Sequence, residues 1–350
     1  MRSMRAVVAV LVFALQLLVA VPAAFAGLCD FDPGTHTINV QLQGSLTISR
    51  SGQNITLNGV VCHTVTTVDT IDADLGGQGN ASIVWDLSHG PLAPGFTDEK
   101  PGEDPDSSEI EMNVTNPGPT GRATVIGGSE GESFTVGERS VGDARFLAFN
   151  FNGGDELFGE DEDAVIPGPV ARIVLTGNGG GDLLSGAGTA VAGSHPVTIP
   201  MTISDGPGSD NVVGGDAADK FVPGPSVTEA DSYDGGKGKD TLSFKGRTAA
   251  MLVTEDDNFN DGVHCPGATC EGDNVGPDVE KVVGGSGGDT ITGSGAANVF
   301  NGGGGADTLK GAGGNDVLSG GPGNDVLNGG PGTDTCKQGT GTGPKTACEL

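Results

Sequence analysis

The chain is poor in aromatic residues: its 350 residues include one Trp, one Tyr and 13 Phe. So few large apolar side chains argue against a conventional core and against sugar subsites built on aromatic platforms. Basic residues are also scarce, because 17 Lys and Arg stand against 46 Asp and Glu. The resulting net charge of -29 argues against a nucleic-acid partner or an anionic membrane surface, and it favours cations as partners.

Catalytic motifs are missing as well. No His-Glu-x-x-His sequence occurs, which excludes the zinc-protease domain that carries it. Two Gly-x-Ser-x-Gly matches, at Ser129 and Ser286, lie in Gly-rich turns, whereas a hydrolase elbow lies between a strand and a helix. The acidic pair Asp161 and Asp163 has the chemistry of a glycosidase pair, but in so acidic a chain it is better explained as solvated charge. We therefore expect no catalytic residue and a protein that is not an enzyme.

The first 26 residues differ from the rest of the chain. Arg2 and Arg5 precede a long apolar run, and the small residues Ala24 and Ala26 flank the end of that run. This pattern predicts a signal peptide over residues 1–26; a retained membrane anchor is the alternative. We expect a secreted protein with no membrane span in the mature chain, since no later stretch is long and apolar enough to cross a bilayer.

Six cysteines in an exported chain indicate disulfides. Sequence alone leaves about 15 pairings open. Proximity along the chain favours three short loops, closed by Cys29 with Cys62, Cys265 with Cys270, and Cys336 with Cys348.

A nine-residue repeat fills the C-terminal part of the chain. From Gly284 to Lys337 the sequence divides into GGSGGDTIT, GSGAANVFN, GGGGADTLK, GAGGNDVLS, GGPGNDVLN and GGPGTDTCK, with no insertion. Each copy follows the pattern G-G-x-G-x-D-x-U-x, where U is apolar. The glycines permit positive φ angles and close approach of neighbouring turns, and D-x-U-x is typical of a brief strand with U pointing inward.

This block resembles the RTX repeat family of secreted bacterial calcium-binding proteins. The resemblance implies an all-β fold, a right-handed parallel β-roll or β-solenoid in which two repeats complete one coil. Asp residues 18 positions apart then stack in two rows, one of Asp289, Asp307 and Asp325, the other of Asn298, Asp316 and Asp334.

The stacked acids predict a metal site. Adjacent coils lie about 4.8 Å apart, and two carboxylates at that separation repel by about 3.5 kcal/mol at an effective dielectric of 20. Oxygen-rich, flexible sites favour several Ca²⁺ ions over transition metals, with Mg²⁺ the lesser candidate. We expect the block to be disordered without Ca²⁺. The turn glycines expected to contribute carbonyl ligands are Gly285, Gly287, Gly303, Gly305, Gly314, Gly321, Gly323 and Gly332.

One repeat departs from the pattern. GSGAANVFN lacks the second Gly and has Asn298 in place of Asp, so the site shared by Asn298 and Asp316 should be weaker. Upstream, degenerate copies suggest an irregular continuation of the solenoid. Their acids are further candidate ligands, with a purely structural turn as the alternative: Asp182, Asp210, Asp219 and Asp240.

The whole chain therefore has a predicted order of segments. A signal peptide is followed by a β-rich cap or solenoid start at residues 27–126, which contains a Pro-rich acidic loop at 87–122. A degenerate solenoid at 127–283 leads to the six repeats at 284–337 and a C-terminal cap at 338–350, which folds back over the last coil.

Two functions remain open. The favoured one is a secreted protein that folds on Ca²⁺ and acts as a structural, adhesive or cation-binding surface, with a cell surface or a polysaccharide as its contact. The other is a polysaccharide-active β-helix enzyme, of the lyase or epimerase kind, that uses the repeats as a folding module. The sequence does not indicate an oligomeric state.

Overall fold

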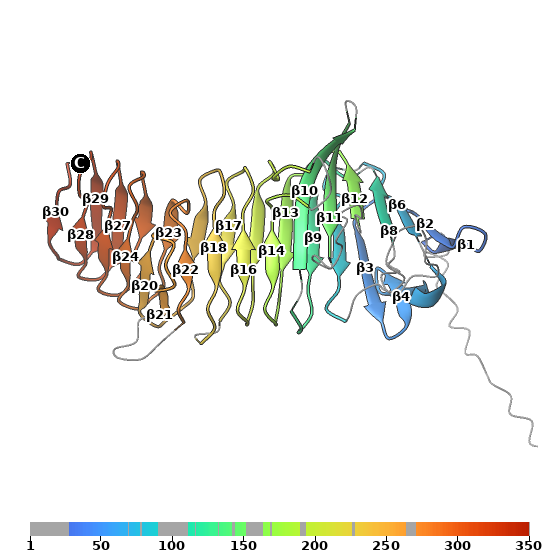
Figure 1. The fold of residues 1–350 in the computed structure, drawn as a ribbon, viewed down its shortest axis with the longest axis horizontal. Coiled ribbons are helices and arrows are strands. Elements are labelled where there is room, and N and C mark those ends of the chain that lie inside the picture. Colours follow the sequence, from blue (N-terminus) through green and yellow to red (C-terminus); the bar gives the residue numbers. More distant parts are fainter. Residues whose placement is uncertain are drawn as a thin grey trace, which may run out of the picture.

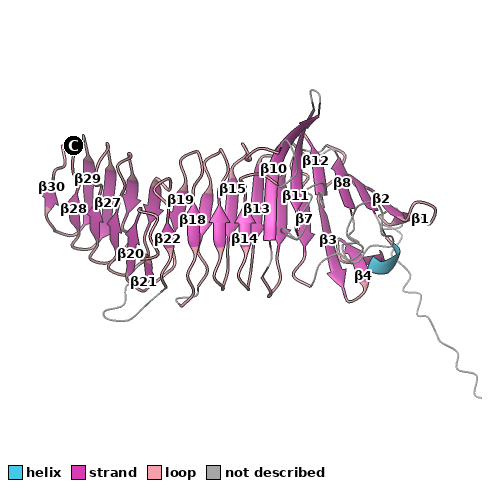
Figure 2. Ribbon diagram, in the orientation of Figure 1, coloured by secondary structure: helices cyan, strands magenta, loops and turns pink. Residues whose placement is uncertain are grey.

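The computed structural model describes residues 28–68, 70–77, 79–89, 111–115, 117–131, 133–141, 144–151, 164–168, 170–189, 194–225, 228–263 and 271–349. The chain forms an elongated stack of short strands, with β1 near one end and the C-terminus at the other (Figure 1). Apart from one turn of 3-10 helix at Val65–Thr67, the described elements are strands (Figure 2). The predicted all-β solenoid is confirmed. The predicted signal peptide and the Cys265–Cys270 pair lie outside the described residues.

The first face of the stack is an 11-stranded sheet among the described residues. Its strands pair in parallel, except at β1–β2 and in the β10–β11–β12 segment, where the pairing is antiparallel. In spatial order they are β1 (Asp30–Asp32), β2 (Thr37–Gln41), β6 (Thr70–Asp74), β8 (Glu111–Thr115), β12 (Ala164–Pro167), β11 (Ala144–Asn150), β10 (Ser133–Val141), β14 (Leu183–Ser185), β16 (Asn211–Val213), β18 (Ser232–Asp234) and β22 (Asn274–Val275).

The second face is a 13-stranded sheet that continues along the whole described stack. It starts with an antiparallel β5–β4–β3 segment and is parallel from there on. Its order is β5 (Val60–Thr64), β4 (Asn54–Leu57), β3 (Leu46–Ser51), β7 (Ile83–Asp86), β9 (Arg122–Ile126), β13 (Arg172–Thr176), β15 (Met201–Ser204), β17 (Lys220–Val222), β19 (Thr241–Ser243), β23 (Lys281–Val283), β25 (Val299–Asn301), β27 (Val317–Pro322) and β29 (Thr335–Thr340).

A third, six-stranded sheet provides the other face at the C-terminal end, where the 11-stranded sheet has stopped. The two faces of the repeat block are therefore this sheet and the last strands of the 13-stranded sheet. Its order is β21 (Gly262–Val263), β20 (Met251–Thr254), β24 (Thr290–Thr292), β26 (Thr308–Lys310), β28 (Val326–Asn328) and β30 (Lys345–Thr346).

Register within the repeat block follows the 18-residue period. Thr290 pairs with Thr308 and Thr308 with Val326 on one face, while Val299 pairs with Val317 on the other. Two nonapeptides therefore complete one coil. The central residue of each short strand points inward, because successive side chains alternate between the two faces of a strand. The resulting core column is 0–1% exposed: Ile291, Leu309, Leu327, Val282, Phe300 and Leu318.

The loop predicted at 87–122 contains a strand. Residues 111–115, inside the loop predicted at 87–122, form β8, which pairs with β6 and β12. Met112 and Val114 are buried there. Two alternating apolar side chains are therefore enough to form a strand within a polar segment. Within the degenerate solenoid, β20 occupies Met251–Thr254 and pairs with β24, and Met251 and Val253 are likewise buried.

The tail was expected to fold back over the last coil as a cap. In the structure, part of it continues the repeat and forms part of a further coil. β29 runs on to Thr340, and β30 pairs in parallel with β28, with Leu327 opposite Lys345. Gly339 and Gly341 take φ angles of 84° and 151°, so they keep the turn geometry of the repeats without the Asp. The disulfide between Cys336 and Cys348 joins this extra turn to the last coil.

The N-terminal end is closed by the first disulfide, which links Cys29 to Cys62 as proximity predicted. Nearby, Trp85 is fully buried and its ring centroid lies 4.9 Å from that of Phe149 and 5.6 Å from that of Phe151. This aromatic cluster gives the N-terminal half a core of ordinary large side chains. The described part of the chain contains no helix with the length and apolarity that a membrane crossing requires.

Candidate metal centre

The first row of acids lies just before the strands of the six-stranded sheet. The backbone N–H of Asp289 donates to Oδ1 of Asp307 at 2.8 Å, and that of Asp307 donates to Oδ1 of Asp325 at 3.1 Å. All three residues are at most 1% exposed. The 18-residue spacing thus places these carboxylates one above another on the same rim of the solenoid.

The second row lies on the opposite rim, before the strands of the 13-stranded sheet. The N–H of Asn298 donates to Oδ1 of Asp316, and the N–H of Asp316 donates to Oδ1 of Asp334, both at 2.8 Å. The row ends in the tail, where the N–H of Asp334 donates to Oε2 of Glu349 at 2.6 Å. Glu349 therefore takes the place of the next Asp, although sequence reasoning did not single it out.

The second carboxylate oxygen of the row acids indicates where a cation could bind. Oδ2 of Asp307, Asp316, Asp325 and Asp334 is buried and has no hydrogen-bond partner. Each of these oxygens faces the first glycine of its own repeat; a Cβ on Gly320, for example, would lie 2.1 Å from Oδ2 of Asp325. A buried carboxylate oxygen without a partner is costly unless a positive charge reaches it. The donor set of these residues fits a hard cation such as Ca²⁺.

The glycines predicted as ligands lie in the turns that bound these rows. Six of the eight adopt positive φ: Gly303, Gly305, Gly314, Gly321, Gly323 and Gly332. Gly285 and Gly287 do not have positive φ, and their carbonyl oxygens face the next coil. A Cβ on Gly303 would lie 2.1 Å from the carbonyl oxygen of Gly285, and a Cβ on Gly305 would lie 2.0 Å from that of Gly287. The turns of successive coils therefore stack at backbone contact, with carbonyl oxygens directed from one turn to the next.

Burial changes the acidity of the rows. It raises the pKa of Asp307 to about 6, with smaller contributions from the charges of Asp289 and Asp325. Burial also raises the pKa of Asp289 and Asp316. Burial therefore makes the charged form of these three carboxyl groups less favourable than it is in water.

The four upstream candidates lie in similar rows, directly before strands of the 11-stranded and 13-stranded sheets. The N–H of Asp182 donates to Oδ1 of Asp210 at 2.7 Å, and the N–H of Asp219 donates to Oδ1 of Asp240 at 2.7 Å. Asp210 and Asp240 each retain a buried Oδ2 without a partner. Burial raises the pKa of Asp210 and Asp240 to about 7. The degenerate repeats therefore keep the geometry of the regular ones.

Sequence reasoning missed the acids that link these upstream residues into rows. The N–H of Asp210 donates to Oδ1 of Asp231, and the N–H of Asp240 donates to Oε2 of Glu280. The N–H of Asp231 in turn donates to Oδ1 of Asp273. Each link crosses an insertion, so its spacing differs from 18. The available signal was an acid directly before a short strand with a buried central residue, as in Asp231 before Ser232–Asp234.

Glu255 was missed for another reason. Its Oε2 accepts a hydrogen bond from Nδ2 of Asn298 at 2.8 Å and one from the N–H of Ser294 at 3.2 Å, while its Oε1 is buried and unpartnered. Glu255 is 3% exposed, and burial raises its pKa to about 8. The one regular repeat without an Asp thus receives a carboxylate from a residue 43 positions upstream. No local sequence pattern predicts this contact.

Replacing Glu255 by Gln is expected to weaken calcium binding beside Asn298 by about 10-fold to 100-fold, because the carboxylate that accepts from the side-chain amide of Asn298 is removed. The double variant Glu255→Gln with Asn298→Asp is expected to recover most of the loss, since it returns the acid to its usual position. Calcium titration by calorimetry measures both. Unchanged binding in the single variant, or no recovery in the double variant, contradicts the assignment of Glu255.

Acid is expected to restore part of the strand signal of calcium-free protein. The folded-state pKa is about 6 for Asp307, about 7 for Asp240 and about 8 for Glu255, all above the ordinary carboxyl values, so folding takes up protons. This contribution to stability is complete below the ordinary pKa and is lost as the pH rises through the folded-state values. Circular dichroism in chelator from about pH 8 to about pH 5 should show strand signal increasing. A signal that falls over this range contradicts the expectation.

Comparison with known proteins agrees with this geometry. A family model of the RTX calcium-binding nonapeptide repeat matches residues 276–309, 283–318 and 301–336. The comparison with curated proteins gives no match. The matched residues include both regular rows and the turn glycines between them. Residues 276–336 of this chain are therefore RTX calcium-binding nonapeptide repeats, a motif that binds several Ca²⁺ ions.

Proposed function

We propose that this chain is a secreted, non-enzymatic protein that orders its solenoid on Ca²⁺ and presents it as a structural, adhesive or cation-binding surface outside the cell. The observation that carries the proposal is the set of buried, unpartnered Oδ2 atoms in the two rows. The two disulfides at the ends of the stack support an oxidising location.

The ions would lie along both rims, each held between acids and turn carbonyls of successive coils. In the regular rows a backbone N–H fixes Oδ1 of Asp307, Asp316, Asp325 and Asp334, so Oδ2 of these four residues is left in a defined direction for a cation. The proposed side-chain ligands are Asp289, Asn298, Asp307, Asp316, Asp325 and Asp334 in the regular repeats, with Asp182, Asp210, Asp219 and Asp240 upstream. The proposed backbone ligands are the carbonyls of Gly285, Gly287, Gly303, Gly305, Gly314, Gly321, Gly323 and Gly332.

Calcium suits this arrangement better than the alternatives. The donors offered are carboxylate and carbonyl oxygens, which favour hard cations over transition metals. Mg²⁺ demands a near-ideal octahedron and retains several waters, whereas Ca²⁺ accepts irregular oxygen cages. The turns supply such irregular, closely stacked oxygens, because the backbone of one coil contacts the backbone of the next.

Equilibrium dialysis of the full-length protein against Ca²⁺ tests the proposal by counting ions directly. Several ions per chain are expected, and the double variant Asp307→Asn with Asp325→Asn is expected to bind fewer. Asp72→Asn is the matched control, because Asp72 is exposed and lies far from the rows in the N-terminal half. A count of zero, or equal counts for the row variant and the control, overturns the proposal.

A groove beside the β10–β11 hairpin is relevant to the enzymatic alternative. It has a volume of about 550 Å³ and is lined by Glu138, Arg145, Phe146, Leu147, Gly168, Thr198 and Ile199. Glu138 is the one carboxylate among these residues, and its Oε1 already accepts hydrogen bonds from the N–H and the hydroxyl of Thr198. Glycoside hydrolysis requires a pair of carboxyl groups, which the lining of this groove does not offer, so we propose it as a binding surface and not as a hydrolytic site. Release of unsaturated sugars from pectin or alginate by calcium-loaded protein would overturn this preference.

A further inference from the structure

Three buried carboxylates meet at one point in the degenerate part of the solenoid, outside the matched repeats. Asp205 follows β15, Asp210 precedes β16 and Asp231 precedes β18, so the cluster joins successive coils. One oxygen of each lies within 4.8 Å of the others. The residues are 1%, 3% and 4% exposed, respectively. Unlike the row acids, Asp205 occupies the first position of its turn, where the regular repeat has glycine.

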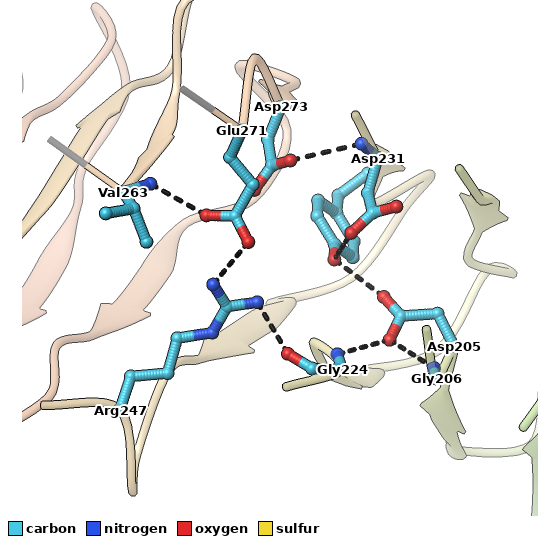
Figure 3. A network of polar contacts seen from close by, with 9 residues as sticks. Asp205, Gly206, Gly224, Asp231, Arg247, Val263, Glu271 and Asp273 are labelled. Carbon is cyan, nitrogen blue, oxygen red and sulfur yellow. Dashed lines mark hydrogen bonds and ion pairs between the residues drawn. The ribbon is translucent and has the colours of Figure 1, made fainter. Parts of the chain in front are cut away.

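The backbone fixes one oxygen of each carboxylate. Oδ1 of Asp205 accepts the N–H groups of Gly206 and Gly224 at 2.7 and 2.6 Å (Figure 3). Oδ1 of Asp210 accepts the N–H of Asp182 at 2.7 Å. Oδ1 of Asp231 accepts the N–H of Asp210 at 3.0 Å. All three side chains are therefore held with Oδ2 as the remaining free donor atom.

The described protein groups do not provide a hydrogen-bond donor for each of the three Oδ2 atoms. The hydroxyl of Tyr233 lies 2.6 Å from Oδ2 of Asp205 and 3.2 Å from Oδ2 of Asp231, but it has a single proton and can donate to one of them at a time. Oδ2 of Asp210 is buried and has no partner at all. Two of the three oxygens therefore lack a donor at any moment, in a site that water does not reach.

The basic residue drawn beside the cluster in Figure 3 is engaged elsewhere. The guanidinium of Arg247 pairs with Glu271 and donates to the carbonyl of Gly224 at 2.6 Å (Figure 3). The three acids thus need a positive charge that these protein groups do not provide.

We propose that Asp205, Asp210 and Asp231 bind one Ca²⁺ ion inside the solenoid, at a site separate from the repeat block. Oxygens that share one Ca²⁺ ion at 2.3–2.6 Å lie at most about 5 Å apart, a limit that the three carboxylates already meet. Three carboxylates give a net negative, all-oxygen site, which selects a hard divalent cation. The hydroxyl of Tyr233 borders the ion and donates to Asp205.

Terbium luminescence tests this site, because Tb³⁺ substitutes for Ca²⁺ and is excited by a neighbouring aromatic ring. Tyr233 is the only tyrosine in the chain, so emission with a tyrosine excitation spectrum reports this site and not the repeats. Full-length protein is expected to show such emission, saturating at one ion and displaced by excess Ca²⁺. Asp210→Asn and Asp231→Asn are expected to lose it, as is Tyr233→Phe.

Two controls separate this proposal from the calcium binding of the repeats. Asp216→Asn removes a partly exposed acid on a neighbouring turn and should leave the tyrosine-excited emission unchanged. Asp307→Asn with Asp325→Asn should reduce the dialysis count while keeping the emission. Absence of tyrosine-excited emission from the unmodified protein, or its persistence in Asp210→Asn, overturns the site. The result for the unmodified protein decides the matter even if a variant fails to fold.

Discussion

Chelation of calcium from the full-length protein at neutral pH is expected to abolish the strand structure of residues 284–337 while the N-terminal half stays folded. Ordering a Gly-rich segment costs about 1–2 kcal/mol of backbone entropy per residue, and each coil of the block buries only two apolar side chains in return. Stacked carboxylates add repulsion unless a cation lies between them. The N-terminal half depends instead on its aromatic cluster around Trp85.

Far-UV circular dichroism and Trp85 fluorescence measure the two halves separately. Chelator should remove a large share of the strand signal, and Ca²⁺ should restore it, with Trp85 emission nearly unchanged throughout. Because the chain has one Trp, its fluorescence is an internal control for global unfolding. A strand signal that survives chelation contradicts the prediction, and simultaneous loss of both signals shows that the block and the N-terminal half unfold together.

Replacing Gly323 by Ala is expected to destabilise the calcium-loaded block by about 3 kcal/mol or more. Gly323 has a φ of 152°, and a Cβ there would lie 1.5 Å from the carbonyl oxygen of Gly305 in the preceding coil. Both the backbone angle and the contact exclude a side chain, and the atom in the way belongs to the backbone, so it cannot rotate aside. The coils would have to separate at this point.

Gly313→Ala is the matched control. The φ of Gly313 is not in the left-handed region. A Cβ on Gly313 would lie 3.7 Å from the Cα of Gly295, which is an ordinary van der Waals contact. Alanine there should be neutral or slightly stabilising, because it restricts the unfolded chain. Urea denaturation in saturating Ca²⁺ compares the two variants. Equal midpoints for Gly323→Ala and Gly313→Ala would show that the coil spacing is not limited by glycine.

The regular block was predictable because one period determines most of its geometry. Eighteen residues per coil place Asp307 next to Asp325 and Leu309 next to Leu327, so both the rows and the core column follow from counting. Strands β26 and β28 are only three residues long, and glycine at fixed positions allows few other ways to stack the coils. The proximity argument likewise gave the two described disulfides.

The remainder depends on contacts that sequence spacing does not encode. Asp231 and Glu280 join the rows across insertions of different length, and Glu255 reaches Asn298 from another coil. Strand β8 is so short that its alternation of apolar and polar residues was not recognised beside a Pro-rich acidic segment. The tail was expected to fold back over the last coil through a Cys336–Cys348 pair, whereas Gly339 and Gly341 keep the turn geometry of the repeats and part of the tail continues the coil.

The exchange of sheets between β22 and β20 affects how the two halves of the solenoid influence each other. On one face the hydrogen-bond ladder runs without interruption from β5 to β29, but on the other it stops at β22 and a new ladder begins at β21. Nearest-neighbour coupling in a repeat array is carried by such ladders. Among the described residues, this face of the junction keeps the isolated bridges Glu255–Val275 and Asp261–Asp273 in place of a full ladder. A disturbance that starts among the ion-dependent coils should therefore spread toward the N-terminus mainly through the 13-stranded sheet.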